Sequence, residues 1–512
     1  MSQDATAEFG KLRSFFWPVH MYELKKMLPM FLMMLFISFN YTILRDTKDT
    51  LVVTAGGAEV IPFLKFWGVL PSAVIFMLIY SKLSNSLSKE KLFYVTLFPF
   101  MIFFALFATV FYPLRDMLHP NESANWLQAS LPESFGGMIA VYRNWTFSLF
   151  YILSELWGSA VLSLMFWGFA NDIMKVTEAK RVYTFFGMGA NVALLLSGPS
   201  IIYFSNIRKL LPPDVDAWQI TLNYLMGMVV IACLCIYAIY WWIQRNVLTD
   251  TRFYDPAQQA KAKKSKPKMS ISESFLFLAK SPYILCIALL VIGYGIAINL
   301  VEVTWKGQIN KLHSNPNDYN AFMGLFSTIG GAVNISMMFI GGWIIRRFGW
   351  GIAAMLTPII LMLTGLGFFS FVIFQDSSLL QGFVSYFGAT TVSMAVVLGM
   401  IQNLASKSTK YSLFDPTKEM AYIPLDQESK VKGKAAIDVV GARLGKSGGS
   451  LIQQVLILSL GFGAIAPYVA VIMVATIGAW LVAVRSLNKQ FLLLTGEKST
   501  KASSKEPAAA AL

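Results

Sequence analysis

The chain has 512 residues, of which 56% are hydrophobic and only 14% are charged. Soluble domains carry about 25% charged residues, so this composition excludes an ordinary soluble protein. The net charge of +14 does not indicate nucleic-acid binding, because most cations lie in short connections between apolar runs, where they set membrane topology. The composition predicts an all-α polytopic membrane protein.

Twelve apolar runs follow one another along the chain, each near the ~20 residues that a membrane-spanning helix needs. We expect spanning helices at 28–44, 60–80, 92–113, 144–170, 182–205, 218–243, 282–304, 320–345, 352–374, 379–404, 436–462 and 465–484.

The connection after the sixth run, "RNVLTDTRFYDPAQQAKAKKSKPKMSISES", is the longest and most basic one. It predicts two six-helix bundles joined by a flexible linker, and the low-complexity end of the chain predicts a disordered tail. The expected organisation is a segment at 1–27, a bundle at 28–243, a linker at 244–281, a bundle at 282–484 and a tail at 485–512.

The distribution of Lys and Arg predicts the topology. If both termini lie on one side, that side receives 31 of the 42 Lys and Arg, the opposite side receives 8, and 3 fall within spans. The positive-inside rule then places both termini and the central linker in the cytoplasm.

The two halves resemble each other. "YTILRDTKDTL" at the first span matches "INLVEVTWKGQI" at the seventh, and "TEAKRVYTFFGMGAN" after the fourth matches "QESKVKGKAAIDVVGAR" after the tenth. Two parallel six-helix halves are typical of major-facilitator-type carriers, which hold substrate near the membrane midplane.

Charged residues inside spans are costly, about 2.5–3.5 kcal/mol each, and indicate function by default. Glu155 stands in the middle of the fourth span, and a structural hydrogen bond to a neighbouring helix is its alternative role. Lys446 and Arg443 are three residues apart in the eleventh span and so share a helix face.

The stretch around Lys446, "GARLGKSGGS", is not a phosphate-binding P-loop, because only three residues separate Gly441 from Gly445 where the motif needs four. Gly441, Gly445 and Gly449 recur every four residues instead, a spacing that lets membrane helices pack closely. A nucleotide-hydrolysing enzyme is therefore not expected, and a non-transporting scaffold explains none of the intramembrane charges.

Two further charged groups stand at the predicted ends of spans. Arg45 and Lys48 belong to "RDTKDT" after the first span, where an ordinary solvated helix end is an equal alternative. Glu302 and Lys306 end the seventh span and are spaced to pair with each other.

Together the cations Lys48, Lys446, Arg443 and Arg45 outnumber the buried acids considered so far, which favours a polyanionic solute. Tyr151 and Trp157 lie near Glu155, where stacking on a base is one role and simple packing is the commoner one.

Four motifs, "FNYTILRDTKDTLVVT", "YILSELWGSAVLSLMFWGFANDI", "INLVEVTWKGQ" and "GKAAIDVVGARLGKSGGS", closely resemble the ATP/ADP translocases of obligate intracellular bacteria and plastids, most of all the chlamydial exchangers. The resemblance extends from about residue 11 to 490. It implies that two lysines and two glutamates are critical for transport, and by motif these are Lys48, Glu155, Glu302 and Lys446.

The resemblance also implies import of external ATP in exchange for internal ADP, a form of energy parasitism, across the bacterial inner membrane. ATP and ADP are then the partners besides lipid, with no metal, no cofactor, no nucleic acid and no obligate protein partner expected. Related transporters carry nucleotides by proton symport, so a proton-coupled importer with Glu155 or Glu302 as proton carrier stays open.

Overall fold

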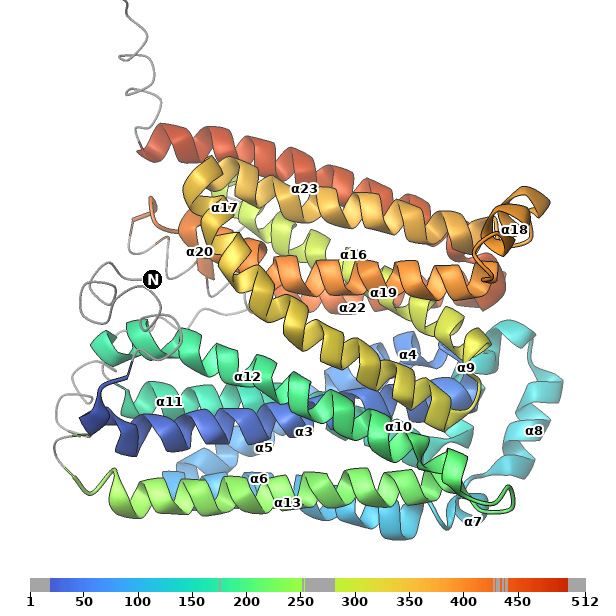
Figure 1. Ribbon diagram of the computed structural model, residues 1–512, viewed down its shortest axis with the longest axis horizontal. Helices are drawn as coiled ribbons and strands as arrows, with labels where there is room; N and C mark the ends of the chain where they lie inside the picture. The colour runs from blue at the N-terminus through green and yellow to red at the C-terminus, as the bar shows by residue number, and fades with distance from the viewer. Residues whose placement is uncertain are drawn as a thin grey trace, which may run out of the picture. The chain divides into compact units, whose positions relative to one another are not determined.

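A computed structural model describes residues 19–174, 176–250, 253, 281–426, 429, 433–434, 437 and 441–495. Within these residues every regular element is a helix and no strand occurs (Figure 1). The all-α class is therefore confirmed. Most of the predicted segment 1–27, the linker 244–281 and the tail 485–512 lies outside the described residues. The described part of the tail, 485–495, is helical, so the expected start of a disordered tail at 485 is wrong.

The first part of the chain forms seventeen short and long helical elements, several of which continue one another. They are η1 (Met21–Glu23), α3 (Leu24–Gly56), α4 (Val60–Phe63), η2 (Leu64–Val69), α5 (Leu70–Ser86), α6 (Lys89–Leu106), η3 (Phe107–Phe111), α7 (Arg115–Leu118), α8 (Asn121–Ser130), η4 (Glu133–Phe135), α9 (Gly136–Arg143), α10 (Trp145–Trp157), η5 (Gly158–Phe166), α11 (Trp167–Ile173), α12 (Val176–Ser205), η6 (Asn206–Leu210) and α13 (Ala217–Asn246).

The second part has nine described elements. They are α16 (Pro282–Leu312), α17 (Pro316–Ile373), α18 (Ser378–Ser385), α19 (Thr391–Thr409), η7 (Lys410–Phe414), α20 (Asp415–Ala421), α22 (Ala442–Leu460), η9 (Phe462–Ala464) and α23 (Ala466–Thr495).

Among the described residues, nine helices are long and apolar enough to cross a membrane. One of the nine, α17, has 58 residues and contains Gly349 at φ 79°, where two helices meet at a kink. This accounts for two predicted spans, 320–345 and 352–374. The multi-pass class is confirmed, and the count of twelve spans remains a prediction.

Several spans are longer than the sequence indicated, among them the last, which was expected to end at 484 and continues as α23 to Thr495. The first was expected to end at residue 44, but α3 continues to Gly56, and α16 continues past the expected end at 304 to Leu312. The error has one cause: apolar content falls where charged residues begin, while the backbone remains helical because those residues find partners in the packed interior. Charged residues assigned to helix ends therefore lie inside helices.

The tenth predicted span, 379–404, is wrong in position. Residues 378–385 form the short helix α18, and the long helix α19 begins only at Thr391. It continues through η7 and α20 to Ala421, so much of the stretch 405–435, read from the sequence as a polar loop, is helical.

The chain divides into two compact units. Unit 1 comprises Met1–Lys264 and Ile309–Ile335, and unit 2 comprises Ser265–Gln308 and Ser336–Leu512. Unit 1 thus includes the end of α16 and the first part of α17, whereas a division at the linker alone would give these residues to the second half.

The central helix of unit 1 is α3, which packs against α10, α12 and α13 (Figure 1). In unit 2, α16 has the corresponding role. Its Trp305 donates to Val396 O of α19 at 2.9 Å, and Tyr294 lies edge-on to Trp480 of α23 at 6.1 Å. It also contacts α22 through facing glycines. In each half the first long helix therefore packs against the last three, as the internal resemblance predicts.

Candidate functional site

The charged segment of α3 is buried in unit 1. Asp46, Lys48 and Asp49 have exposed fractions of 0%, 3% and 1%. The alternative of a solvated helix end is therefore wrong for these residues. Buried charges remain ionised at tolerable cost only when each has a partner of opposite sign and hydrogen bonds, so the partners define the site.

Lys48 is held by two carboxylates and one aromatic ring. Its Nζ lies 2.8 Å from Asp49 Oδ1 and 2.9 Å from Glu155 Oε1 on α10. The same atom stands 4.0 Å from the centre of the Tyr151 ring, a cation–π contact. Asp49 is buried, whereas Glu155 is 31% exposed. Glu155 is therefore the carboxylate of this ion cluster that a solute can contact.

Glu155 stands just before a change in helix geometry. α10 ends at Trp157 and continues as η5, a stretch of π-helix from Gly158 to Phe166. Such stretches are uncommon and occur frequently at functional sites. Glu155 also has the alternative role of joining two helices, because its partner Lys48 lies on a different helix.

Arg45 is neutralised by its neighbour on the same helix. Its Nε lies 2.9 Å from Asp46 Oδ1, and its Nη2 donates to Ser327 Oγ at 2.6 Å. Ser327, in the part of α17 that belongs to unit 1, donates in turn to Asp46 Oδ2 at 2.5 Å. Arg45 is thus a member of a closed polar triangle and is 17% exposed.

The charge balance of this cluster differs from the expectation of excess cations. Arg45 and Lys48 face three acids, Asp46, Asp49 and Glu155. The sequence interpretation did not count the two aspartates as buried, because it placed them beyond the end of the helix. Any excess of positive charge must come from unit 2.

In unit 2, Glu302 and Lys306 form the expected pair on α16. Lys306 Nζ lies 3.2 Å from Glu302 Oε1, four residues earlier on the same helix. Lys306 is 2% exposed and Glu302 is 22% exposed. As in unit 1, the lysine is covered and a glutamate is the more accessible partner.

Lys446 is exposed on α22. The large apolar residues exposed on the same helix are Leu444, Leu451, Val455 and, at its last position, Leu460. At about 100° per residue, Lys446 projects about 160° away from Leu444. Lys446 therefore lies opposite the face that carries Leu444, Leu451 and Val455, while Leu460 at the end of the helix lies on the side of Lys446. Arg443 belongs to the same helix, and its side chain lies outside the described residues.

The glycines of α22 pack as their spacing predicts. A Cβ added at Gly295 of α16 would lie 2.8 Å from Gly445 Cα, and one added at Gly445 would lie 3.1 Å from Gly295 Cα. Asn299, one turn further along α16, donates to Lys446 O at 2.9 Å and to Ser450 Oγ at 2.8 Å. This amide fixes the backbone that carries Lys446; it belongs to the motif "INLVEVTWKGQ", but nothing in the sequence singles it out.

The two aromatic candidates near Glu155 are both fully buried. Tyr151 lies beneath Lys48 with 0% exposure, and Trp157 is also 0% exposed. Trp157 Nε1 donates to Ile37 O at 3.0 Å, and its ring meets Phe100 edge-on at 5.8 Å. The positions favour a supporting role for Tyr151 and a packing role for Trp157.

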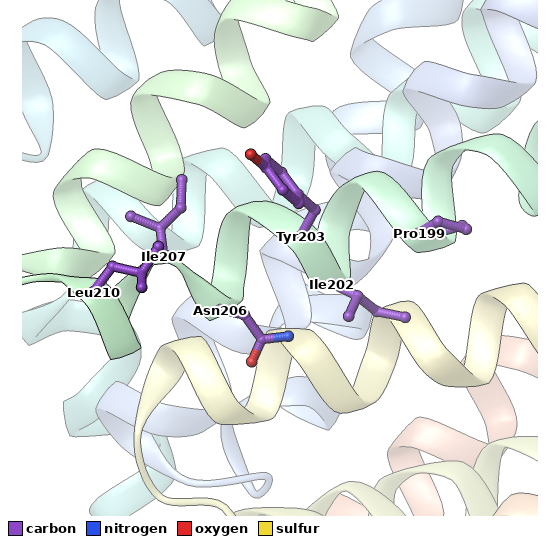
Figure 2. A pocket seen from close by; sticks show the side chains of 6 residues that line it. All are labelled: Pro199, Ile202, Tyr203, Asn206, Ile207 and Leu210. Carbon is purple, nitrogen blue, oxygen red and sulfur yellow. The ribbon is translucent and has the colours of Figure 1, made fainter.

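A hollow of about 380 Å³ also occurs at the end of α12 and along η6. Figure 2 shows its lining side chains, Pro199, Ile202, Tyr203, Asn206, Ile207 and Leu210. Asn206 is the one amide in a lining that carries no charge, so the hollow lacks the groups that bind a polyanion.

The long apolar helices and the charged pairs among them define a polytopic membrane protein of the all-α class. Solved structures agree on the fold. A bacterial homologue of the iron transporter ferroportin in an inward-facing state superposes with a TM-score of 0.58 at 12% identity, covering 92% of this chain and 99% of that one. A D-xylose–proton symporter gives 0.54 at 12% identity, covering 90% and 97%.

The chain belongs to the TLC ATP/ADP transporter family, whose family model matches residues 2–491. It is 60% identical to ADP,ATP carrier protein 1 of Chlamydia muridarum over 100% of this chain and 98% of that protein. It is 61% identical to ADP,ATP carrier protein 1 of Chlamydia trachomatis, over 97% and 94%. The chloroplastic ADP,ATP carrier protein 1 of Arabidopsis thaliana is 52% identical, over 94% of this chain and 76% of that protein. The resemblance inferred from the four motifs is confirmed.

Proposed function

We propose that this protein is an ATP/ADP antiporter that imports external ATP in exchange for internal ADP. The observation that carries the proposal is the buried Lys48 between Asp49 and Glu155, within a chain 60% identical to a protein named as an ADP,ATP carrier. It moves its substrate without hydrolysing it, in the bacterial inner membrane with both termini in the cytoplasm. Membrane lipid and the two nucleotides are its expected partners.

The way in which Lys48 binds the substrate follows from its three hydrogen-bond donors. An ammonium has three N–H groups, and Asp49 and Glu155 each accept one in the empty site. A phosphate oxygen competes best with Glu155, because that carboxylate is the exposed one of the two. Phosphate binding thus displaces Glu155 while Asp49 keeps the lysine in place.

In unit 2 the proposed binding groups are Lys446 with Arg443 for phosphate and Glu302 as the exchangeable carboxylate. Lys306 gives Glu302 a partner when no nucleotide is bound. The requirement for exchange then has a physical source: an empty carrier keeps its glutamates on its lysines, and the loaded carrier releases them. We expect the two halves to follow the alternating-access scheme of carriers with this architecture.

Purified protein in liposomes tests the proposal. Labelled ATP should enter vesicles preloaded with ADP or ATP and should not enter empty vesicles. Uptake into empty vesicles, accelerated by an inward proton gradient, would support proton symport instead. Lys446→Ala should abolish uptake with normal insertion, whereas Lys89→Gln removes an exposed ion pair to Asp172 and should leave uptake unchanged.

Membrane potential gives a second test. ATP and ADP differ by about one charge, and moving one charge across the membrane corresponds to about 2.3 kcal/mol per 100 mV. Exchange of ATP for ADP should therefore respond to an imposed potential, while ATP-for-ATP exchange should not. Equal response of the two would show that a compensating ion moves with the substrate.

A further inference from the structure

Lys410 of unit 2 falls between two of the expected spans, but it lies within a helix that packs along the candidate membrane span α16. The helix formed by α19, η7 and α20 is continuous from Thr391 to Ala421. Lys410 begins its π-helical part, η7. An ionisable group within a span is a functional-site hypothesis with a partner to be identified.

Contacts with α16 show how far along that helix Lys410 lies. At one end, Tyr283 Oη donates to Ala421 O at 2.7 Å. Further along, Lys410 Nζ lies 5.9 Å from the centre of the Tyr294 ring. Both intervals are eleven residues (294 − 283 and 421 − 410), so the two helices run antiparallel in register. Lys410 is therefore about 16 Å along the helix from the Tyr283 level, at 1.5 Å per residue.

Lys410 has a carboxylate partner and remains accessible. Its Nζ lies 2.9 Å from Asp415 Oδ2 and 4.5 Å from the centre of the Tyr411 ring. The exposed fractions are 28% for Lys410 and 34% for Asp415. Lys306, by comparison, is 2% exposed. Asp415 is thus an accessible carboxylate that can be displaced from its lysine, as proposed for Glu155 and Lys48, although Lys410 is itself more exposed than Lys48.

The internal repeat supports the same assignment. Glu178 of "TEAK" and Glu428 of "QESK" are 250 residues apart (428 − 178). That offset maps η5 (Gly158–Phe166) onto 408–416, which contains η7. Both halves thus carry a π-helical stretch at the same place in the repeat, next to a charged residue, and such stretches occur often at functional sites.

We propose that Lys410 is a further substrate-binding residue that contacts the phosphate groups of the nucleotide, and that Asp415 occupies it when the site is empty. The inference rests on the proposed nucleotide exchange and adds a phosphate contact to the same site. Tyr294 stacks on Phe414 with the ring centres 5.3 Å apart. This stacking fixes the ring that Lys410 faces.

The test compares variants of purified protein in two assays, exchange in liposomes and thermal stabilisation by ATP or by adenosine. Lys410→Gln should raise the KM for ATP roughly tenfold or more, the loss of one charge-assisted contact, and should reduce stabilisation by ATP but not by adenosine. Lys410→Arg should stay within about threefold of the wild type. The matched control is Lys434→Gln, because Lys434 also pairs with a carboxylate, Glu419 at 2.6 Å, but at an exposed position.

A double variant separates binding from a purely structural ion pair. If the pair were only structural, Lys410→Gln combined with Asp415→Asn would restore what the single change lost, since no unpaired charge would remain. Restoration of the KM would overturn the inference, as would a wild-type KM in Lys410→Gln. If the wild-type protein neither exchanges ATP nor is stabilised by it, the proposed function fails as well, so the two failures are distinguishable.

Discussion

The ion clusters of the two units hold their lysines in different ways. In unit 1, Lys48 of α3 pairs with Glu155 of α10, so the cluster exists only where two helices pack. In unit 2, Glu302 and Lys306 pair within α16, and that helix is fixed against α22 by glycine contacts and by Asn299. The difference shows that charge joins two helices in unit 1, whereas in unit 2 the glycines and Asn299 join the helices and the ion pair lies within one of them.

The largest effect is expected at Lys48. Lys48→Gln removes the cation that both the buried Asp49 and Glu155 contact, and breaking a buried pair on one side costs about 3–5 kcal/mol. Exchange should fall at least a hundredfold, and the melting temperature of the purified protein should drop clearly.

Two controls accompany Lys48→Gln. Lys89→Gln should change neither quantity, because its partner Asp172 lies with it at the surface. Normal exchange in Lys48→Gln would show that the ion cluster of unit 1 takes no part in transport.

A glycine pair tests the packing of unit 2. Gly295→Ala places a Cβ 2.8 Å from Gly445 Cα, so the helices must separate, at about 1–3 kcal/mol by analogy with overpacked cores. Exchange should fall strongly although no charge has changed. Gly448→Ala is the matched control, because its Cβ meets nothing within 4 Å and alanine favours the helix by about 0.5–1 kcal/mol. Equal behaviour of the two variants in thermal unfolding would contradict the close crossing.

Glu302→Gln should separate transport from stability. The pair it breaks lies within one helix and does not join α16 to another helix. We expect exchange to fall at least tenfold while the melting temperature changes little. Glu155→Gln should lower both, since its partner lies on another helix. If Glu302→Gln proves the less stable of the two, the contrast between the units is wrong.

The smallest expected effect is a pH dependence confined to unit 1. The chain has three histidines, His20, His119 and His313, and all three fall within unit 1. Burial lowers the pKa of His119 and of His313 below the ordinary value of 6.5. The folded state then binds fewer protons than the unfolded chain below that value, so stability should decrease as the pH falls through 6.5.

Thermal unfolding between pH 7.5 and 5.5 measures this effect. The double variant His119→Gln, His313→Gln should have a flatter profile than the wild type over that range. His119 Nε2 lies 2.7 Å from Thr146 Oγ1, a contact that a glutamine amide can replace. An unchanged slope would show that neither histidine is responsible.

The membrane class and the family could be predicted from the sequence alone, and Glu155 and Lys446 could be singled out from it as candidate site residues. Apolar runs near 20 residues leave few alternatives to helices in lipid, because backbone groups there must be satisfied within the chain. Single charges inside such runs, as at Glu155, stand out for the same reason. The glycine spacing of α22 predicted close packing correctly, since it depends only on helix period and side-chain size.

Only the tertiary structure decided where helices end and which charges pair. A polar stretch such as "RDTKDT" has the same composition in a solvated loop and in a packed helix, and what separates the two is the presence of partners from elsewhere in the chain. Lys48 has Glu155 and Asp46 has Ser327, 107 and 281 residues away, distances that no local pattern encodes. Lys410 fell outside the expected spans for the same reason. The Tyr294 ring that it faces belongs to a helix more than a hundred residues earlier in the chain.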